Sequence, residues 1–186
     1  DCEKADCLLV NSDFVKDTFI NNGYDRKRIK VAYLGVREDF FNLKKSYSIT
    51  KKFKILFTGN FSFRKGAEYL LRALQELDKL NISYEMTVVG SYEGAKELIE
   101  KYRSNHIRFV GHVPQDELKS YLAVSDIYLF PSLCEGCASS GMEAMAAGLP
   151  IIATKESGFP IEDTVNGIII PSKSIAHIVN SIIQLS

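Results

Sequence analysis

The chain has 186 residues, of which 46% are hydrophobic and 25% are charged, and its formal net charge at pH 7 is zero. A chain of this length is enough for one well-buried domain. Because the charges balance and no polybasic run is sustained, we expect no nucleic acid partner. Neither a signal peptide nor an apolar stretch of about 18 residues, the length that spans a membrane, is visible, so the residues predict a soluble, cytoplasmic domain.

Signals for strands and helices alternate along the chain. Near its start, the apolar run at 7–10 predicts a strand, Ser12 caps a helix that stops at Gly23, and residues 29–33 form a second strand. The strands expected after these are 53–58, 84–89, 107–109, 127–130, 150–153 and 167–171. The expected helices run from 67 to about 80, and over 94–102, 115–124, 141–147 and 174–185. Such repeated units predict an α/β fold, with a parallel sheet covered by helices on both faces.

Several residues suited to ligand binding come at or just after the ends of these strands, namely Gly59, Gly90, Gly111 and Glu135. The carboxyl ends of parallel strands meet at one edge of a sheet, and ligands gather there. A glycine at a strand end also lets the backbone approach a ligand closely. We therefore expect the binding site at this edge.

The most informative segment is 131–150, where seven residues separate Glu135 from Glu143. Ser140 and Glu143 fit a capping box that opens the helix at 141–147, with Ser140 as the N-cap. A loop that enters the amino-terminal end of a helix presents unpaired N–H groups and the positive end of the helix dipole. The segment therefore predicts an anion site that suits phosphate.

Two interpretations of Glu143 stay open, and both can hold together. Its carboxylate either serves only as part of the helix cap, or it accepts hydrogen bonds from the hydroxyl groups of a ribose. Glu135 lies in a loop of small residues with no helical partner. For Glu135 the pattern favours a binding role.

Two basic residues, Arg64 and Lys65, follow Gly59 in the loop 59–66. Their charges are suited to neutralise the negative charge that a nucleoside diphosphate gains as it leaves a substrate. The other interpretation is a loop at the start of a helix whose charges are solvated.

The four cysteines do not form a disulfide framework, because they are few for this length. The pair Cys134 and Cys137 has the spacing of a zinc or redox motif, but the spacing of Cys2 and Cys7 is loose for a zinc site. We expect reduced thiols and no metal.

Taken together, an ordered set of short motifs resembles the retaining glycosyltransferases of family GT4, which have the two-domain GT-B fold. The similarity covers nearly the whole chain. In chain order, the matching residues are Gly59, Lys65-Gly66, Val89-Gly90, Phe109-Val110-Gly111-His112-Val113, Ser125-Asp126, Phe130-Pro131-Ser132, Glu135-Gly136, Glu143-Ala144-Met145-Ala146, Gly148-Leu149-Pro150-Ile151-Ile152-Ala153-Thr154 and Gly158.

The resemblance implies that the chain is a piece of a longer enzyme. Residues 1–35 would be the end of the amino-terminal domain and the approach to the hinge. Residues 36–186 would be the nucleotide-sugar-binding domain, a Rossmann-like half of the GT-B fold that is truncated at its carboxyl end. The acceptor would bind mainly to the absent amino-terminal domain, and membrane contact would come only through missing parts.

The resemblance also implies the reaction and the residues that perform it. A hexosyl group would pass from a UDP-, GDP- or ADP-sugar to an acceptor hydroxyl with retention of anomeric configuration, without a cofactor. Lys65 and Arg64 would stabilise the diphosphate, Glu135 would hold the sugar, Glu143 the ribose, and Val113 would meet the nucleobase. The other expected contacts of the nucleotide-sugar are Gly59, Asn60, Gly90, Cys137, Ala138, Ser139 and Ser140.

Two departures from the family pattern leave alternatives open. Asn60 stands where relatives carry an arginine, so Arg64 is expected to substitute for it. Many relatives continue Gly-Phe-Gly-Leu after the first glutamate, whereas residues 136–139 of this chain are Gly-Cys-Ala-Ser. This difference is expected to affect which sugar is bound more than which reaction is catalysed. The alternatives are a nucleotide-binding module without catalysis and another GT-B enzyme, such as a nucleotide-sugar epimerase or a phosphorylase.

Overall fold

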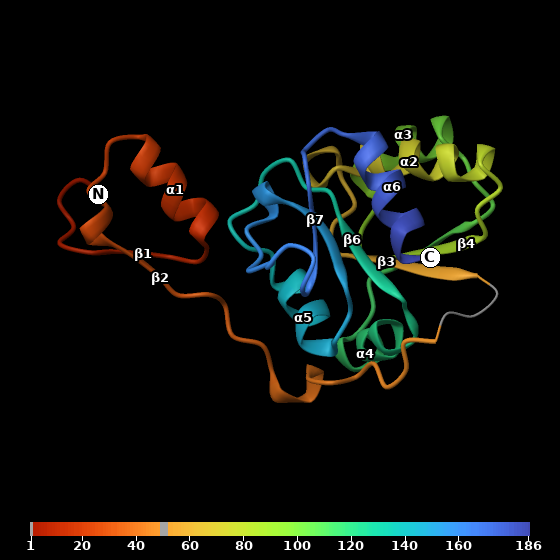
Figure 1. Ribbon diagram of the computed structural model, residues 1–186, viewed down its shortest axis with the longest axis horizontal. Coiled ribbons are helices and arrows are strands. Elements are labelled where there is room, and N and C mark those ends of the chain that lie inside the picture. Colours follow the sequence, from red (N-terminus) through yellow and green to blue (C-terminus); the bar gives the residue numbers. More distant parts are fainter. Residues whose placement is uncertain (1, 49–51) are drawn as a thin grey trace.

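The computed structural model describes residues 2–48 and 52–186; residues 49–51 and Asp1, the first residue of the expected unit 1–35, lie outside the described part. Strands β1 (Leu8–Val10) and β2 (Ile29–Val31) pair in parallel, and helix α1 (Asp13–Asn21) packs on them. The Ser12 side chain accepts a hydrogen bond from the Val15 N–H at 3.1 Å, which confirms the predicted cap. Figure 1 shows this unit to one side of a larger sheet.

The larger sheet has six parallel strands in the order β5-β4-β3-β6-β7-β8. The chain starts in the middle at β3, builds β4 and β5 on one side, and then returns to build β6, β7 and β8 on the other side. This arrangement confirms the predicted α/β class with a Rossmann-like parallel sheet. The strands are β3 (Phe53–Thr58), β4 (Tyr84–Val89), β5 (Ile107–Gly111), β6 (Ile127–Phe130), β7 (Ile151–Thr154) and β8 (Gly167–Ile170).

Helices cover both faces of this sheet, as predicted. Helices α2 (Ala67–Lys79), α3 (Lys96–Lys101) and α6 (Ile175–Leu185) lie together on one face, whereas α4 (Gln115–Val124) and α5 (Ser139–Ala147) lie on the other (Figure 1). The apolar residues Ala67, Leu70, Leu71, Leu74 and Leu77 of α2 are buried, because they recur every three or four residues and therefore share one helix face. Short 3₁₀ turns occur at Arg26–Arg28, Glu38–Phe40, Phe63–Lys65, Glu93–Ala95 and Lys155–Ser157.

The core lies where the central strands meet the helices. All four residues of β6 and of β7 are buried, which is typical of parallel strands covered on both faces. Phe57 of β3 and Phe130 of β6 stack with ring centroids 5.3 Å apart. The carboxyl ends of these strands are therefore set rigidly beside each other.

The segment that connects the two sheets packs across the end of α5. Phe40 is fully buried in the core of the larger sheet. The N–H groups of Asn42 and Lys44 donate to the carbonyl oxygens of Ala146 and Ala147, each at 2.9 Å. These bonds satisfy carbonyls that the last turn of a helix leaves without partners, so the segment holds the carboxyl-terminal end of α5 in place.

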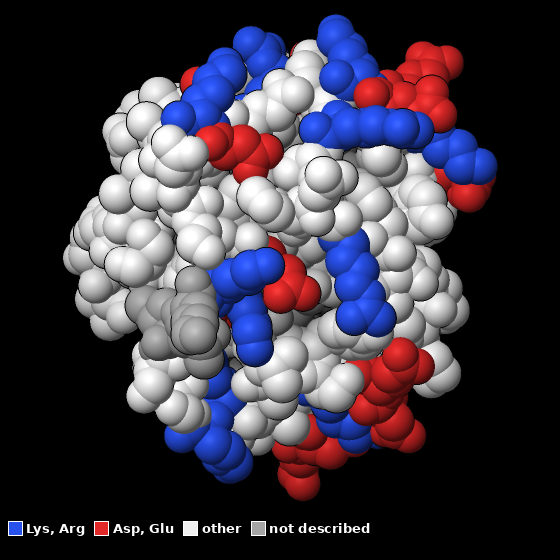
Figure 2. Space-filling view, turned by 90° about the vertical axis from the view of Figure 1, so that its right-hand side faces the viewer, with Lys and Arg blue, Asp and Glu red and all other residues white. Residues whose placement is uncertain are grey.

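Charges of both signs share the molecular surface. On the face that Figure 2 shows, Lys and Arg side chains lie beside Asp and Glu side chains, and uncharged residues cover much of the rest. This distribution agrees with the zero net charge of the chain. Within residues 2–48 and 52–186, none of the helices has both the length and the apolar character needed to cross a membrane.

Candidate functional site

The candidate site lies at the carboxyl ends of β3, β4 and β6. The strand order reverses between β3 and β6, and a crevice for ligands forms at such a reversal. Gly90 has φ of +127°, and a Cβ atom on it would lie 2.2 Å from the Gly59 carbonyl oxygen. Only glycine fits there, and the loops after β3 and β4 therefore touch at this edge.

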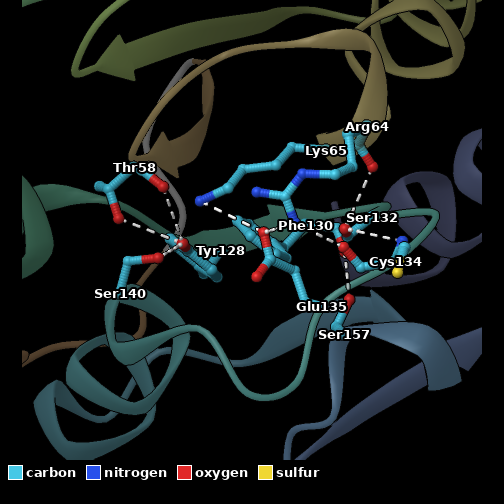
Figure 3. Close-up of polar contacts among 10 residues, drawn as sticks. All are labelled: Thr58, Arg64, Lys65, Tyr128, Phe130, Ser132, Cys134, Glu135, Ser140 and Ser157. Atoms are coloured by element: carbon cyan, nitrogen blue, oxygen red, sulfur yellow. Dashed lines mark hydrogen bonds and ion pairs between the residues drawn. The ribbon is translucent and has the colours of Figure 1, made fainter.

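Glu135 forms ion pairs with both basic residues of the loop after β3. Its Oε1 atom lies 2.9 Å from Arg64 Nη1 and 3.6 Å from Lys65 Nζ (Figure 3). The same Arg64 atom donates to the Cys134 carbonyl oxygen at 2.8 Å. Oε1 is buried, yet it receives no well-aligned hydrogen bond from any described residue, so charge attraction alone holds it. A buried carboxylate oxygen without a hydrogen bond is costly, and a ligand donor that replaced these cations would satisfy it.

Lys65 is held by the local shape of its loop. Gly66 has φ of +80°, and a Cβ atom on it would lie 2.0 Å from the Pro131 carbonyl oxygen. The glycine therefore lets the loop after β3 press against the loop after β6. As a result, the Lys65 ammonium group lies 5.3 Å from the centroid of the Phe130 ring, and its side chain is only 13% exposed.

The loop after β6 forms backbone hydrogen bonds with the loops on both sides of it. The Leu133 N–H donates to the Arg64 carbonyl oxygen, and the Glu135 N–H donates to the Glu156 carbonyl oxygen, each at 2.9 Å. These bonds link it to the loops after β3 and β7. The backbone that carries Glu135 is thus held by hydrogen bonds to both neighbouring loops.

The predicted capping box at Ser140 and Glu143 is wrong. Helix α5 begins at Ser139, and its N-cap is Ala138, which makes no side-chain cap. Ser140 lies inside the helix, where its hydroxyl oxygen accepts a hydrogen bond from Tyr128 Oη at 3.0 Å. The helix thus begins earlier than expected, and the Ser140 hydroxyl makes a tertiary contact instead of a cap. Its first backbone N–H groups still lack acceptors within the helix.

Glu143 is half-buried on α5. Burial raises the pKa of this carboxyl group, and nearby Arg37 opposes the rise. In the described part of the chain, no hydrogen bond reaches its carboxylate, and the helix cap does not involve it. The interpretation of Glu143 as a cap alone is therefore wrong, and its role toward ribose stays a prediction.

The structure brings some of the expected site residues together. A Cβ atom built on Gly59 would lie 3.2 Å from Lys65 Nζ and 3.9 Å from Ser140 Oγ, so these three residues border one space. Asn60 and Ser139 are exposed, whereas Ala138 and Val113 are partly buried against the core. Val113 follows β5 on the same edge of the sheet.

Cys137 is buried, and burial raises the pKa of its thiol to about 11. It therefore stays protonated at neutral pH. Cys2, Cys7 and Cys134 are exposed, and all four thiols are free. No group of three or more His, Cys, Asp and Glu side chains suited to a metal ion occurs among the described residues.

Three site residues were missed by the sequence analysis. Tyr128 and Thr58 share a hydrogen bond of 3.1 Å beneath the site, and a tyrosine in a short apolar strand was the available signal. Ser12 of the amino-terminal unit donates to the Gly136 carbonyl oxygen beside Glu135. No local pattern signals that contact, because 124 residues separate its partners.

Three cavities border the sheet among the described residues, and two of them lie near β7. One of about 260 Å³ lies between α1 and the residues after β7, and its lining includes Tyr33, Lys155 and Phe159. A larger cavity of about 490 Å³ includes Leu149, Pro150 and Gly167. These residues precede or begin β7 and β8, so the larger cavity is at the opposite end of the strands from Glu135.

The comparisons with known proteins define the class. The model of the family described as Glycosyl transferases group 1 matches residues 39–186. The chain therefore belongs to the group 1 glycosyl transferases. Among curated relatives, the amylovoran biosynthesis glycosyltransferase AmsK of Erwinia amylovora is 29% identical over 191 residues, which cover 96% of this chain and 47% of AmsK.

Solved structures share the fold at lower identity. Sucrose-phosphate synthase from Thermosynechococcus elongatus has a TM-score of 0.80 and 22% identity, and the match covers 98% of this chain and 49% of that protein. HepE from Anabaena, solved in complex with UDP and glucose, has a TM-score of 0.77 and 21% identity, and the match covers 97% of this chain and 53% of HepE. The likeness bears out the expected fold class, one half of a GT-B fold. The chain spans about half the length of these proteins.

Proposed function

We propose that this chain is the nucleotide-sugar-binding part of a retaining glycosyltransferase, which transfers a hexosyl group from a UDP-, GDP- or ADP-sugar to an acceptor hydroxyl. One observation carries the proposal: cationic and acidic side chains gather beside the amino-terminal half of α5, where the strand order reverses. The complex of HepE with UDP and glucose supports a donor of this chemical class. The proposed catalytic and ribose-binding residues are Arg64, Lys65, Glu135 and Glu143.

The diphosphate of the donor is proposed to bind between Lys65 and the first N–H groups of α5. The ammonium group and the helix dipole both favour negative charge there. Arg64 adds a second cation, since Asn60 stands where relatives carry an arginine. Together these groups stabilise the charge that develops on the diphosphate as the sugar leaves.

The two carboxylates are proposed to hold the donor at both ends. Glu135 accepts hydrogen bonds from sugar hydroxyls, and Glu143 accepts them from ribose. Val113 contacts the nucleobase. The remaining proposed contacts of the nucleotide-sugar are Gly59, Asn60, Gly90, Cys137, Ala138, Ser139 and Ser140.

The acceptor is proposed to bind mainly to a domain outside these residues. Its hydroxyl attacks the sugar on the face that the leaving phosphate occupies, so that the phosphate helps to remove the proton and the anomeric configuration is kept. No cofactor takes part in this scheme. We propose that the reaction occurs in the cytoplasm.

Replacement of Glu143 by glutamine tests the proposal. Because the pKa of Glu143 is raised in the folded chain, its ionised form destabilises the fold at neutral pH. Glu143→Gln is therefore expected to raise the melting temperature while it weakens nucleotide binding about 10-fold or more, since a charged hydrogen-bond acceptor is lost. Calorimetry with UDP, GDP and ADP and a thermal melt measure the two effects.

Glu97→Gln is the matched control, because Glu97 is an exposed glutamate on α3. It is expected to change neither quantity measurably. Unchanged affinity in Glu143→Gln for every nucleotide that the unaltered chain binds would contradict the ribose role.

A further inference from the structure

Tyr128 places a hydroxyl group directly beneath the candidate site. It belongs to β6, next to the point where the strand order reverses, and its side chain is fully buried. Its Oη atom lies 3.0 Å from Ser140 Oγ and 3.1 Å from Thr58 Oγ1 (Figure 3). It therefore connects the end of β3 with the first turn of α5.

The hydrogens of these hydroxyl groups can be assigned by counting. A tyrosine hydroxyl has one hydrogen to donate, and the acceptors within reach are Ser140 Oγ at 3.0 Å, Thr58 Oγ1 at 3.1 Å and the Thr58 carbonyl oxygen at 3.3 Å. We assign the hydrogen to the shortest of these contacts, to Ser140, and the Thr58 hydroxyl then donates to Tyr128. Burial raises the pKa of Tyr128 to about 12, so the donor hydrogen is present at neutral pH.

This order of donors leaves the hydrogen of Ser140 for another acceptor. Within the part of the chain that the structure describes, Tyr128 is the partner that reaches Ser140 Oγ. The same oxygen borders the space beside Gly59 that Lys65 Nζ also borders. A hydroxyl hydrogen and an ammonium group on one space form a site for an anionic oxygen.

We propose that Tyr128 is a positioning residue for the donor, in a relay in which Thr58 donates to Tyr128, Tyr128 donates to Ser140, and Ser140 donates to a phosphate oxygen. The inference rests on the proposed function, because it needs a nucleoside diphosphate at this edge of the sheet. Without the phenol hydroxyl, the Ser140 hydroxyl would lose the donor that orients its own hydrogen toward the phosphate. The phosphate would then lose a donor, whereas the nucleoside would keep its contacts.

The test compares nucleoside diphosphates with nucleosides. Calorimetry with UDP, GDP and ADP, and NMR titration with uridine, guanosine and adenosine, are carried out on the unaltered chain, Tyr128→Phe, Ser140→Ala and the double variant. Each single variant is expected to bind the preferred diphosphate more weakly by about 10-fold or more, which is the effect of one hydrogen bond to a charged acceptor. Affinity for the nucleoside is expected to stay the same. The double variant is expected to bind the diphosphate no more weakly than Ser140→Ala, because both changes break one relay.

Tyr84→Phe is the matched control. Tyr84 is another large tyrosine of the core, and its hydroxyl lies within hydrogen-bond distance of Asp78 Oδ1, at 2.9 Å, and of the Leu74 carbonyl oxygen, at 3.2 Å, toward the other end of the sheet. This variant is expected to lower the melting temperature and to leave diphosphate affinity unchanged.

Several outcomes would overturn the inference. Additive losses in the double variant, equal losses for nucleoside and diphosphate, or a loss in Tyr84→Phe as large as that in Tyr128→Phe would reduce Tyr128 to a packing role. If Tyr128→Phe does not fold, unchanged diphosphate affinity in Ser140→Ala is enough to overturn it. An unaltered chain that binds none of the diphosphates would overturn the proposed function as well.

Discussion

At the scale of single residues, Glu135 forms ion pairs with Arg64 and Lys65, the two cations that are proposed to bind the diphosphate. Its Oε1 atom is 2.9 Å from Arg64 Nη1 and 3.6 Å from Lys65 Nζ. We expect a bound diphosphate to compete with this carboxylate for the same cations. As the cations turn to phosphate, the carboxylate would become available to sugar hydroxyls. Under the proposed function, diphosphate binding and sugar binding would therefore be coupled through one exchange of partners.

Glu135→Gln is expected to change the affinity for UDP and for UDP-glucose in opposite directions. The neutral amide releases Arg64 and Lys65, so UDP should bind about 2- to 5-fold more tightly, the range of a partly exposed ion pair. UDP-glucose should lose affinity relative to UDP, because its sugar meets a weaker acceptor. Calorimetry with both ligands measures this difference, with Glu97→Gln as control. An equal change for both ligands would rule out the exchange.

At the scale of elements, α5 is held at both ends. Its first turn bonds to β6 through Tyr128 and Ser140. Beyond its last turn, Tyr47 of the connecting segment donates to the Gly148 carbonyl oxygen at 2.8 Å, in addition to the backbone bonds from the same segment. The helix whose amino-terminal end is proposed to bind phosphate is therefore placed by the segment that leads to the amino-terminal unit.

Within the connecting segment, the Lys44 side chain is expected to make a large contribution to the free energy of unfolding. Its side chain is 4% exposed, and Nζ donates to the Ser125 carbonyl oxygen at 2.6 Å and lies 3.3 Å from Asp126 Oδ1. Lys44→Met would leave Asp126 buried without its cation, at a cost of about 3–5 kcal/mol in the free energy of unfolding. Urea denaturation measures this loss.

The neighbouring Lys45 provides the control, because its side chain is exposed. Lys45→Met is expected to change the free energy of unfolding by about 0.5 kcal/mol at most. Asp126→Asn added to Lys44→Met should recover part of the loss, since the uncompensated charge is removed. Equal effects of the two lysine variants would refute the buried pair as a stabilising contact.

At the scale of the whole molecule, the amino-terminal unit borders the loop that carries Glu135. Ser12 donates to the Gly136 carbonyl oxygen, and a Cβ atom on Gly136 would lie 3.1 Å from the Asn11 side chain. Lys155 Nζ lies 3.4 Å from Asp17 Oδ2 on α1. The described part of the amino-terminal unit thus closes one side of the candidate site.

We expect these 186 residues alone to bind the donor weakly and to transfer nothing, because the proposed acceptor site lies mainly in a domain outside them. Release of UDP, GDP or ADP from the corresponding glucose donor measures turnover. Measurable release above the rate of a heat-denatured sample would contradict this prediction. Donor binding without release would agree with it.

Local patterns in the sequence predicted the elements well. The limits of β3, β4, β6 and α4 agree with the expected ranges, because buried parallel strands are short apolar runs and α4 begins directly after a proline. The loop positions of Arg64, Lys65 and Glu135 were also predictable, since loops follow from the strand limits. The limits of the strands and the positions of the loop residues depend on residues that are close together in the sequence.

Only the tertiary structure decided how the site is built. The partners Arg64 and Glu135, and likewise Thr58 and Tyr128, lie on different strand–loop units that pair only after folding. The capping box failed for the same reason, since Tyr128 competes for the Ser140 hydroxyl. The spacing of residues along the chain determines which segments become helices or strands. The partners of a polar side chain depend instead on which strands lie side by side in the folded sheet.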